Sequence, residues 1–328
     1  MELRPLGRTG VRVSELCLGT MTFGNEADEA TSQAIVDRFL DAGGNFVDTA
    51  NVYSQGVSEE ITGRAIKAHR DNVVLATKVR FQMGDDTNSV GLSRRNIRTQ
   101  VEASLRRLVT EWIDLYQVHC WDARTPLEET LSTLNDLVHE GKVRYIGASN
   151  FAGWHLAKAL GLSALHDWEP FVSLQPEYSL ITRDLERELL PLCQEEGLAV
   201  LPWSPLGGGV LTGKYTKDAD MPAGTRGAET ENPITFTYRL DDRAWNVVDA
   251  VKEVSAATGK SAAQVALNWV GNRRGITAPI IGARNIAQLD DNLGAVGWQL
   301  DDEQRKKLTW ASGFRLGYPY EFIQFSDH

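Results

Sequence analysis

Residues 113–150 read IDLYQVHCWDARTPLEETLSTLNDLVHEGKVRYIGASN, which has the pattern of one complete strand–helix–strand unit. The first strand is a nearly continuous apolar run, 113–118, that ends in the polar His119. Between Pro126 and Gly141 the apolar residues recur three and four positions apart, which predicts one buried helix face: Leu127, Leu131, Leu134, Leu137 and Val138. A second strand, 145–148, then ends in Ser149 and Asn150.

The same order of strand and helix recurs along the whole chain. Strands are predicted at residues 16–18, 45–47, 73–77, 113–118, 145–148, 171–175, 198–203 and 278–282. Strict alternation implies parallel strands joined by right-handed crossovers, and eight such units close into a (β/α)8 TIM barrel of ~250 residues. An open doubly wound sheet is the rival α/β fold. Its usual GxGxxG is missing, because the first strand runs into Gly19-Thr20-Met21-Thr22.

The chain is longer than a minimal barrel, and we assign the excess to three segments of a single domain, 1–328. These are a leading segment with turn signals at Gly7 and Gly10, a long loop at about 216–240, and a tail after about 310. Helix starts carry recognisable caps, such as Ser93 before the apolar series Ile97, Val101, Leu105 and Leu108.

Composition restricts the partners and the compartment. With 34 basic and 44 acidic residues the net charge is −10, so the chain offers no broad basic surface to nucleic acid or to an anionic membrane. The N-terminus has no signal-peptide pattern and no apolar run approaches ~20 residues. The three cysteines form no CxxC pair. We expect a cytoplasmic protein with a small-molecule partner; no pattern indicates an oligomeric state.

Polar and glycine residues follow the predicted strands at their carboxyl ends, where barrel enzymes place their chemistry. Asp48, Lys78 and His119 end three consecutive strands, and Tyr53 lies in the loop after the first of them. Taken singly, each has an ordinary interpretation: a turn former, a solvated lysine, a core histidine and a packed loop tyrosine. Taken together, they meet on one rim.

These four side chains suit carbonyl chemistry. A tyrosine hydroxyl, with a reference pKa of about 10, is a poor proton donor near neutrality unless a cation stabilises its phenolate. Lys78 supplies that cation, Asp48 neutralises and orients Lys78, and His119 hydrogen-bonds a substrate oxygen or assists proton delivery. Tyr53 then protonates the oxygen that gathers charge as a hydride reaches the carbon.

At this point the sequence resembles the aldo-keto reductase family, whose members are (β/α)8 barrels with an Asp, Tyr, Lys and His tetrad. The resemblance runs from GTMTFG at 19–24 to IGAR at 281–284. Its most specific segments are FVDTANVY at 46–53, DLYQVH at 114–119 and GKVRYIGASNF at 141–151. WSPL at 203–206, followed by GKY at 213–215, is similar to the subgroup of bacterial general reductases and potassium-channel β-subunits.

The resemblance implies a nicotinamide dinucleotide lying across the barrel mouth. Ser149, Asn150 and Gln175 would hold its carboxamide, and Trp203 would stack on the nicotinamide ring. Expected pyrophosphate contacts are Ser204, Leu206, Gly208, Lys214 and Arg226. The adenosine end would meet Arg284, Gln288, Asp291 and Asn292. Further residues expected beside the dinucleotide are Gly19, Thr20, Met21, Asp48, Pro205 and Gly282.

Arg284 beside the ribose favours a 2′-phosphate, hence NADP(H), with NAD(H) as the alternative if this arginine only stacks on adenine. The substrate pocket would be lined by Phe23, Phe81 and Trp121, an aromatic wall that suits an apolar aldehyde or a ring-bearing ketone. The aromatic tail is a further candidate for this wall, or else it packs on the barrel: Phe314, Tyr318, Tyr320 and Phe322.

The leading hypothesis is therefore an NADP(H)-dependent reductase of aldehydes or ketones, reversible on alcohols, with Tyr53 as general acid. The alternative is an NADP(H)-binding regulatory or redox-sensing subunit with slow turnover. Residues 208–214 read GxxxxGK, but Tyr215 replaces the Ser or Thr of a P-loop. Residues 147–151 lack the second glycine of a nucleophile elbow. A metal-dependent hydrolase is weaker still, because the strand ends offer one His and one Asp.

Overall fold

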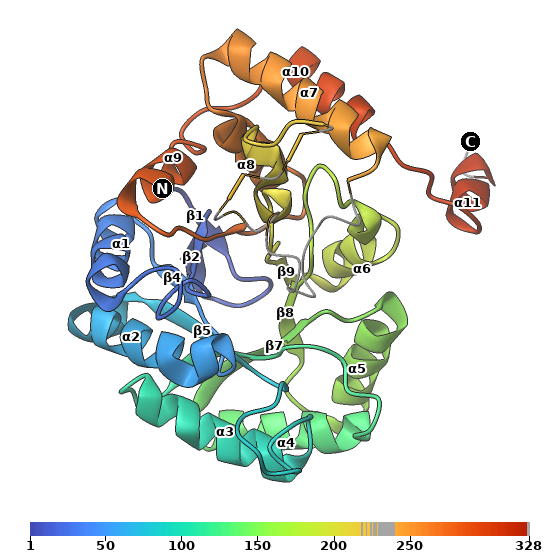
Figure 1. Ribbon diagram of the computed structural model, residues 1–328. Coiled ribbons are helices and arrows are strands. Elements are labelled where there is room, and N and C mark those ends of the chain that lie inside the picture. Colours follow the sequence, from blue (N-terminus) through green and yellow to red (C-terminus); the bar gives the residue numbers. More distant parts are fainter. Residues whose placement is uncertain (218, 221, 224, 226–227, 229–239, 327–328) are drawn as a thin grey trace.

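Eight parallel strands form the centre of the molecule, as the alternation of strand and helix predicts. The computed structural model describes residues 1–217, 219–220, 222–223, 225, 228 and 240–326 (Figure 1). The strands of the eight-stranded sheet are β3 (Cys17–Gly19), β4 (Phe46–Asp48), β5 (Val74–Val79), β6 (Ile113–Val118), β7 (Val143–Ser149), β8 (Phe171–Gln175), β9 (Ala199–Val200) and β10 (Ile280–Ile281).

The sheet closes on itself. Its strand order is β10-β3-β4-β5-β6-β7-β8-β9, so each strand pairs with its neighbour in sequence and the last pairs with the first. The two ends of this order are also joined, because the Ile280 N–H donates to the Pro202 carbonyl oxygen at 2.8 Å and the Thr277 N–H to that of Val200 at 2.9 Å. The structure thus confirms the (β/α)8 barrel.

Helices surround the barrel, and those between successive strands make the parallel crossovers possible. They are α1 (Glu29–Asp41), α2 (Val57–Ile66), α3 (Arg94–Arg107), α4 (Leu127–His139), α5 (Gly153–His166), α6 (Leu189–Glu196), α7 (Asp242–Thr258), α8 (Ala262–Gly271), α9 (Ile286–Leu293), α10 (Asp302–Ala311) and α11 (Tyr320–Ser326). Short 3₁₀ turns are η1 (Tyr53–Gly56), η2 (Lys67–Asn72), η3 (Asp184–Glu186) and η4 (Gly207–Thr212).

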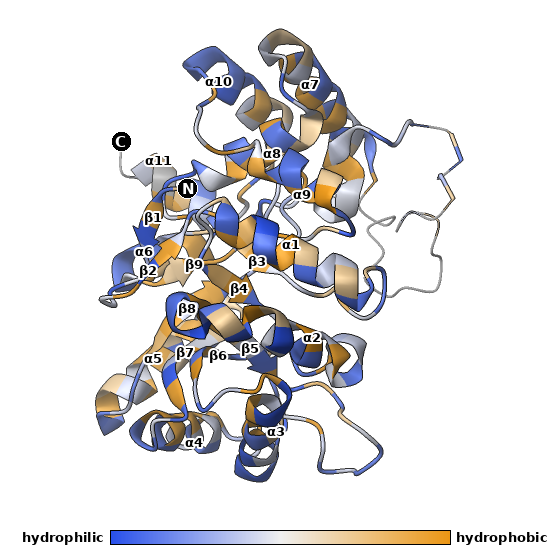
Figure 2. Cartoon of the chain, turned by 90° about the vertical axis from the view of Figure 1, so that its left-hand side faces the viewer, coloured by the Kyte–Doolittle hydropathy of each residue, from blue (hydrophilic) through white to orange (hydrophobic). Residues whose placement is uncertain are grey.

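The predicted helix signals hold in detail. The Ser93 hydroxyl caps α3 by accepting from the Asn96 N–H, and α4 begins directly after Pro126. Gly141, which follows α4, adopts a φ of 76°, a conformation that glycine reaches without strain. Figure 2 shows hydrophilic and hydrophobic residues alternating along α1 and α3, and their buried residues include Ile35, Val36 and Phe39 of α1 and Ile97, Val101 and Leu105 of α3. The helices therefore pack their apolar faces on the strands.

A hairpin closes one end of the barrel, and the sequence did not predict it. Strands β1 (Leu3–Pro5) and β2 (Arg12–Ser14) pair antiparallel, and Figure 2 shows them at the left-hand end of the barrel. Leu6 is fully buried between them and packs on inward side chains of the barrel wall, which include Phe46, Ala76 and Leu115. This apolar layer is the floor beneath the candidate site.

Two strands are shorter than predicted. The apolar run at 198–203 yields only the two residues of β9, and the run at 278–282 only the two of β10. Pro202 and Pro279 stand at the missing positions, and proline has no N–H to donate to a neighbouring strand. The predicted loop at 216–240 falls mostly outside the described residues, and after α10 the tail turns into α11, which projects from the barrel in Figure 1.

Candidate active site

The alternation of side chains along neighbouring strands places polar groups in one layer inside the barrel. Asp48 lies two residues beyond the inward Phe46 on β4, and Lys78 lies two beyond the inward Ala76 on β5. Because successive side chains point to opposite faces of a strand, both must also point inward. On β6 the same rule puts Gln117 above Leu115.

Lys78 is the centre of this layer. Its ammonium donates to the Asp48 carboxylate, to the Thr49 carbonyl oxygen at 2.9 Å and to the Tyr53 hydroxyl oxygen at 3.2 Å. The Lys78 side chain is 0% exposed and that of Asp48 only 3%. Burial alone would lower the pKa of Lys78, but the charge of Asp48, helped by Tyr53, outweighs burial and raises it above its ordinary value. Lys78 is therefore a cation fixed against a tyrosine hydroxyl.

Tyr53 begins the η1 turn, and this turn has an unusual backbone. Ser54, Gln55 and Gly56 adopt φ angles of 47°, 52° and 99°, all in the left-handed region. For the two residues with side chains this costs roughly 1–2 kcal/mol each, so the surrounding contacts must hold the turn. One such contact is the Ser54 hydroxyl, which donates to the Phe23 carbonyl oxygen at 3.1 Å.

His119 follows β6, and its imidazole faces Tyr53. The two ring centroids lie 5.8 Å apart in an edge-to-face arrangement, and the Phe81 ring lies 4.7 Å away. Burial lowers the pKa of His119 well below its usual value, and the charges of Lys78 and Arg80 lower it further. The ring is therefore neutral near pH 7. Among the described residues its Nδ1 is a buried nitrogen with no hydrogen-bond partner.

Amide side chains complete the polar layer, one of which the sequence analysis missed. The Gln175 and Gln117 Nε2 atoms donate to the Asp48 carboxylate at 2.9 and 3.1 Å. Gln175 was an expected cofactor residue, whereas Gln117 was not singled out. Its position, one alternation above Leu115, was the signal that could have identified it. Both amides leave the second carboxylate oxygen of Asp48 to Lys78.

The ends of β6, β7 and β9 are joined through Asn150. Its Nδ2 donates to the His119 carbonyl oxygen at 2.9 Å and to the Ser149 hydroxyl at 3.0 Å, and its Oδ1 accepts from the Trp203 indole at 3.1 Å. The Ser149 hydroxyl in turn donates to the Gln175 carbonyl oxygen at 2.8 Å. The structure thus brings together the four residues expected at the nicotinamide.

Beyond Trp203 the chain forms a glycine-rich cradle, which comprises Ser204–Lys214. Gly207, Gly208 and Gly209 have φ angles of 57°, 65° and 101°. A Cβ at Gly209 would lie 3.1 Å from the Lys214 ammonium, a close contact, and the φ of 101° also favours glycine beside this cation. Space next to a buried turn and an ammonium fits a phosphate group. Pro205 and Leu206 belong to the cradle, whereas Arg226 lies outside the described residues.

The expected adenosine residues gather after β10. The Arg284 guanidinium pairs with the Glu26 carboxylate at 2.6 Å, and the backbone N–H of Arg284 donates to the Gln288 side-chain oxygen at 3.0 Å. Asn292 donates to the Gly282 carbonyl oxygen at 3.1 Å, and Asp291 accepts from Gln264 at 3.0 Å. Nothing lies within 4 Å of a Cβ built on Gly282. Glu26 is an unforeseen partner for Arg284.

The loop after β3 holds the other expected cofactor residues. Thr20 is fully buried, and its N–H donates to the Asp48 carbonyl oxygen at 2.9 Å, which ties this loop to the site. Gly19 ends β3 against the side chain of Ile280, and Met21 is 42% exposed at the rim. These positions are compatible with the expected contacts. The residues expected at the carboxamide, the pyrophosphate and the adenosine carry polar groups whose chemistry fits a dinucleotide.

The structure corrects one residue of the substrate-pocket prediction and bears on the two interpretations of the aromatic tail. Phe23 is fully buried in the hydrophobic core, so it does not line an open pocket. Phe81 is half-buried beside His119, and Trp121 is half-buried against Phe151 and stacked on His155. The aromatic tail lies elsewhere. Phe314 packs on the Arg183 and Arg187 guanidinium groups, and two tail side chains are widely exposed: Tyr318 at 87% and Phe322 at 67%. In Figure 1, α11 projects outward from the barrel.

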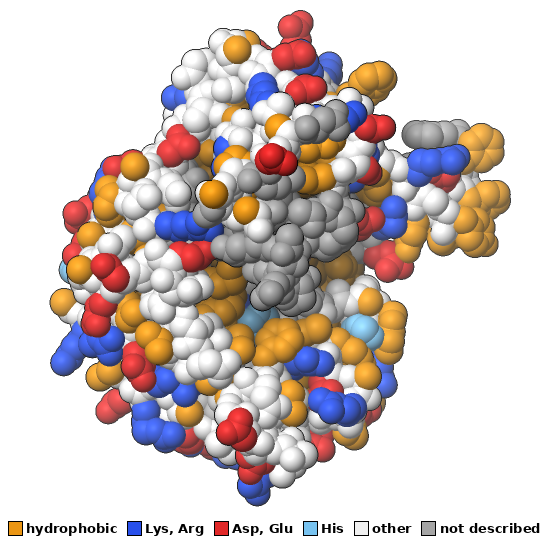
Figure 3. Space-filling view, in the orientation of Figure 1, with side chains coloured by type: hydrophobic (Ala, Val, Ile, Leu, Met, Phe, Trp, Pro, Cys, Tyr) orange, Lys and Arg blue, Asp and Glu red, His pale blue; other side chains and the backbone are white. Residues whose placement is uncertain are grey.

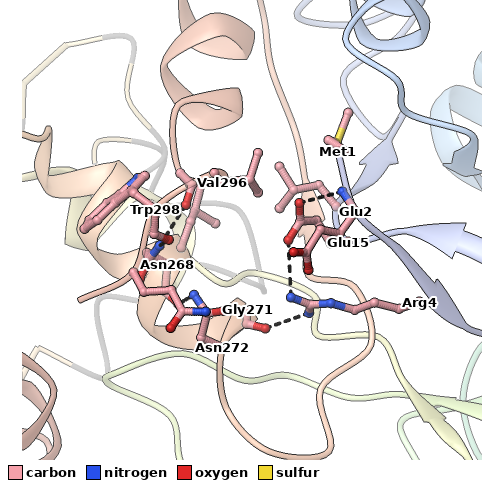
Figure 4. A pocket seen from close by; sticks show the side chains of 14 residues that line it. Met1, Glu2, Arg4, Glu15, Asn268, Gly271, Asn272, Val296 and Trp298 are labelled. Carbon is pink, nitrogen blue, oxygen red and sulfur yellow. Dashed lines mark hydrogen bonds and ion pairs between the residues drawn. The ribbon is translucent and has the colours of Figure 1, made fainter. Parts of the chain in front are cut away.

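Figure 3 views one face of the molecule along the barrel. Figure 3 shows hydrophobic side chains and a histidine at the centre of this face, beside the atoms that are not described. A separate cavity of about 490 Å³ lies at the hairpin end (Figure 4). Several of its polar side chains are bonded to one another or to the backbone, as Arg4 is to the Glu15 carboxylate and to the Gly271 carbonyl oxygen.

These features define a closed parallel barrel with a buried lysine–aspartate ion pair, hydrogen-bonded to a tyrosine, at the carboxyl ends of its strands. Residues 15–311 match the model of the Aldo/keto reductase family. The chain is 44% identical to the uncharacterised oxidoreductase YrpG of Bacillus subtilis, covering 94% of this chain and 95% of the relative. It is 37% identical to the norsolorinic acid reductase stcV of Emericella nidulans (98% and 83% covered) and 36% identical to a probable voltage-gated potassium channel subunit beta of Oryza sativa subsp. japonica (90% and 91%).

The chain belongs to the aldo/keto reductase family. It is thereby placed among oxidoreductases that reduce carbonyl groups with nicotinamide cofactors, and the resemblance seen in the sequence, down to the subgroup, is confirmed. Within the described residues, no helix combines the length and apolar character needed to cross a membrane. The same part of the chain holds no group of three or more His, Cys, Asp and Glu side chains arranged for a metal ion.

Proposed function

We propose that this chain is an NADP(H)-dependent carbonyl reductase that converts aldehydes or ketones to alcohols, reversibly, with Tyr53 as the general acid. The supporting observation is the fully buried Lys78 ammonium, which donates at once to the Asp48 carboxylate and to the Tyr53 hydroxyl oxygen. A relative named norsolorinic acid reductase, 37% identical over nearly the whole chain, supports reductase chemistry.

Reduction of a carbonyl adds a hydride to carbon and a proton to oxygen. A bound nicotinamide would supply the hydride. The Tyr53 O–H bond breaks as its proton moves to the substrate oxygen, which leaves a phenolate 3.2 Å from the Lys78 ammonium. That cation stabilises the phenolate in a site from which water is largely excluded, where a unit charge acts strongly. Asp48 keeps Lys78 charged and in place before the proton moves.

His119 orients the substrate oxygen. Since burial and the charges of Lys78 and Arg80 keep its imidazole neutral, the ring carries one N–H donor rather than a second positive charge beside Lys78. Its edge-to-face contact with Tyr53 places the ring beside the hydroxyl that gives up the proton. Two donors, Tyr53 and His119, thus converge on one oxygen, as an oxyanion requires.

Cofactor binding is assigned to the residues that the structure gathers at the rim. Ser149, Asn150 and Gln175 would hold the carboxamide, and Trp203, oriented by its hydrogen bond to Asn150, would stack on the ring. The cradle and Lys214 would bind the pyrophosphate. Arg284 would bind the 2′-phosphate of NADP(H), in exchange for its pairing with Glu26. Phe81 and Trp121 would contact an apolar or ring-bearing substrate.

A second candidate is a regulatory or redox-sensing subunit that binds NADP(H) and turns over slowly. The similarity to a plant potassium channel subunit beta favours it. This protein would retain the dinucleotide tightly and reduce carbonyls slowly. In either case we place the protein in the cytoplasm, because Cys17, Cys120 and Cys193 are free thiols, as in a reducing compartment.

The decisive experiment measures NADPH oxidation with a panel of aldehydes and ketones. Removal of the proposed acid, in Tyr53→Phe, should lower kcat by roughly 10²- to 10⁴-fold. Tyr318→Phe, the same change at a side chain that is 87% exposed on the tail, serves as the control. Undiminished turnover in Tyr53→Phe would refute the assigned acid. Slow wild-type turnover with a retained dinucleotide would favour the regulatory subunit.

A further inference from the structure

The first turn of α2 is fastened to the loop and strands that carry the site. The Ser58 hydroxyl donates to the Thr20 carbonyl oxygen at 2.7 Å, and it lies 3.0 and 3.1 Å from the hydroxyls of Thr20 and Thr49. Next to it, the Glu59 carboxylate accepts from the Thr77 hydroxyl at 2.6 Å. Thr49 follows Asp48 in the chain and Thr77 precedes Lys78. The first turn of α2 therefore contacts residues next to both members of the ion pair.

Glu59 is a charged group that the proposed mechanism does not use. Its side chain is 0% exposed, and its second carboxylate oxygen pairs with the Arg107 guanidinium at 2.6 and 2.7 Å. Burial, and then the charge of Glu59, raise the pKa of the nearby Tyr116 well above its usual value. A carboxylate is costly to bury unless it is fully paired, so this position calls for a function.

Arg107 connects this carboxylate to the turn that holds Tyr53. A Cβ on Gly56, the last residue of that turn, would lie 2.8 Å from the Arg107 Cδ, so the arginine side chain packs directly on the turn. One carboxylate oxygen of Glu59 thereby binds Thr77 of β5, and the other binds Arg107, which packs against the turn. Thr77 contacts α2, whereas the next residue, Lys78, points into the barrel and reaches Tyr53.

From these contacts we infer that Glu59 is a positioning residue: its buried carboxylate, held between Thr77 and Arg107, fixes the Tyr53 turn against the strand of Lys78. The turn has a left-handed, strained backbone, and a strained segment relaxes when the contacts around it are lost. Contacts such as those of Glu59 are therefore needed to hold the turn in place. The inference rests on the proposed role of Tyr53 as the proton donor, and it adds a residue that touches neither substrate nor cofactor.

The test replaces the charge by an amide of the same size. Glu59→Gln should lower kcat by roughly 10- to 100-fold, as small misplacements of a reacting group do, with KM and the NADPH dissociation constant unchanged. The control is Glu60→Gln, the same change at the next residue, which is exposed. Glu59→Asp, which keeps the charge, should recover part of the loss.

A second readout does not depend on turnover. Tyrosine ionisation followed by ultraviolet difference absorbance, with Tyr53→Phe as the blank, reports the pH at which Tyr53 loses its proton. Lys78 donates to this hydroxyl, the His119 ring packs against Tyr53 and Asp48 pairs with Lys78, and all three are unchanged in Glu59→Gln. Loss of the Glu59 charge leaves the Arg107 cation unpaired beside the turn and would by itself let Tyr53 ionise at lower pH, so an upward shift reports displacement of the hydroxyl from Lys78. A hydroxyl that moves away from Lys78 must ionise at higher pH, so the Tyr53 midpoint and the alkaline limb of kcat should both shift upward.

Thr77→Val provides the same test if Glu59→Gln fails to fold, because it removes only the hydroxyl that donates to Glu59 and keeps the shape of the side chain. An unchanged Tyr53 titration and kcat in both folded variants would overturn the positioning role. Absence of wild-type reductase activity would instead refute the proposed function, while the Tyr53 titration would still decide whether Glu59 sets the position of the hydroxyl.

Discussion

Replacing Lys78 by methionine separates the charge of this residue from its volume. The variant leaves the Asp48 carboxylate buried without its cation, and breaking a buried ion pair in this way costs about 3–5 kcal/mol. Asp48 still accepts from the Gln117 and Gln175 amides at 3.1 and 2.9 Å, so its charge is not left without hydrogen bonds. We therefore expect the lower end, about 3 kcal/mol.

This loss should be visible in thermal unfolding. The unfolding entropy of a chain of this length is about 0.7 kcal/mol/K, so 3 kcal/mol lowers Tm by about 4 °C. Lys158→Met, an exposed position on α5, is the control and should leave Tm unchanged. The double variant Lys78→Met/Asp48→Asn removes both charges and should regain most of the stability without regaining activity. Equal stability losses in Lys78→Met and the double variant would refute the ion-pair explanation.

The stability difference between the wild type and Lys78→Met should depend on pH, because the pKa of Lys78 is raised in the folded state. A group whose pKa is higher in the folded state contributes stability that is fully present below its unfolded value, about 10.4 for lysine, and is lost as the pH rises through the folded value. The deficit of Lys78→Met, measured by urea unfolding, should therefore be constant between about pH 6 and 9 and shrink above about pH 10.4. A deficit that grows in alkali would contradict the assignment.

Three further predictions concern the rim. Since the pKa of His119 is lowered in the folded state, wild-type stability should fall by up to about 1.4 kcal/mol per pH unit below about pH 6.5, and urea unfolding of His119→Asn should lack this component. Fluorescence titration should show that Arg284→Ala weakens the binding of NADPH, but not of NADH, by roughly 10- to 100-fold. Glu26→Gln should tighten NADPH binding, because the carboxylate no longer competes for the guanidinium. Equal effects on both dinucleotides would exclude a 2′-phosphate contact. Gly209→Ala, at a φ of 101°, should weaken both dinucleotides, whereas Gly161→Ala, in the open on α5, should only stabilise the fold by roughly 0.5–1 kcal/mol.

Much of the site could be predicted because parallel strands carry a simple rule. Asp48, Lys78 and His119 end apolar runs, and the barrel closes those ends onto one rim, so sequence position alone brings them together. Gln117 obeys the same rule through its alternation with Leu115. It was missed because it lies inside a run that otherwise reads as apolar.

What could not be predicted depends on contacts between distant segments. Phe23 is an aromatic residue in a loop, and its burial follows from the packing of that loop on α2, which no local pattern specifies. Glu59 looks like an ordinary acidic residue in the first turn of a helix, where acids are common. Only the fold shows that its carboxylate is buried between Thr77 and Arg107.

The hairpin at the other end of the barrel bears on the chemistry as well as on the fold. Leu6 seals the barrel beneath Phe46, Ala76 and Leu115, so the layer that contains Lys78 has apolar side chains below it. Water that entered from that end would screen the attraction between the ammonium and a phenolate, which depends inversely on the local dielectric constant. A polar substitution at Leu6 should therefore reduce the catalytic advantage that Lys78 gives to Tyr53, although it contacts neither residue. A polar residue at Leu6 would thus weaken the electrostatic stabilisation of the Tyr53 phenolate, whereas loss of the Glu59 contacts of α2 would change the position of the Tyr53 hydroxyl.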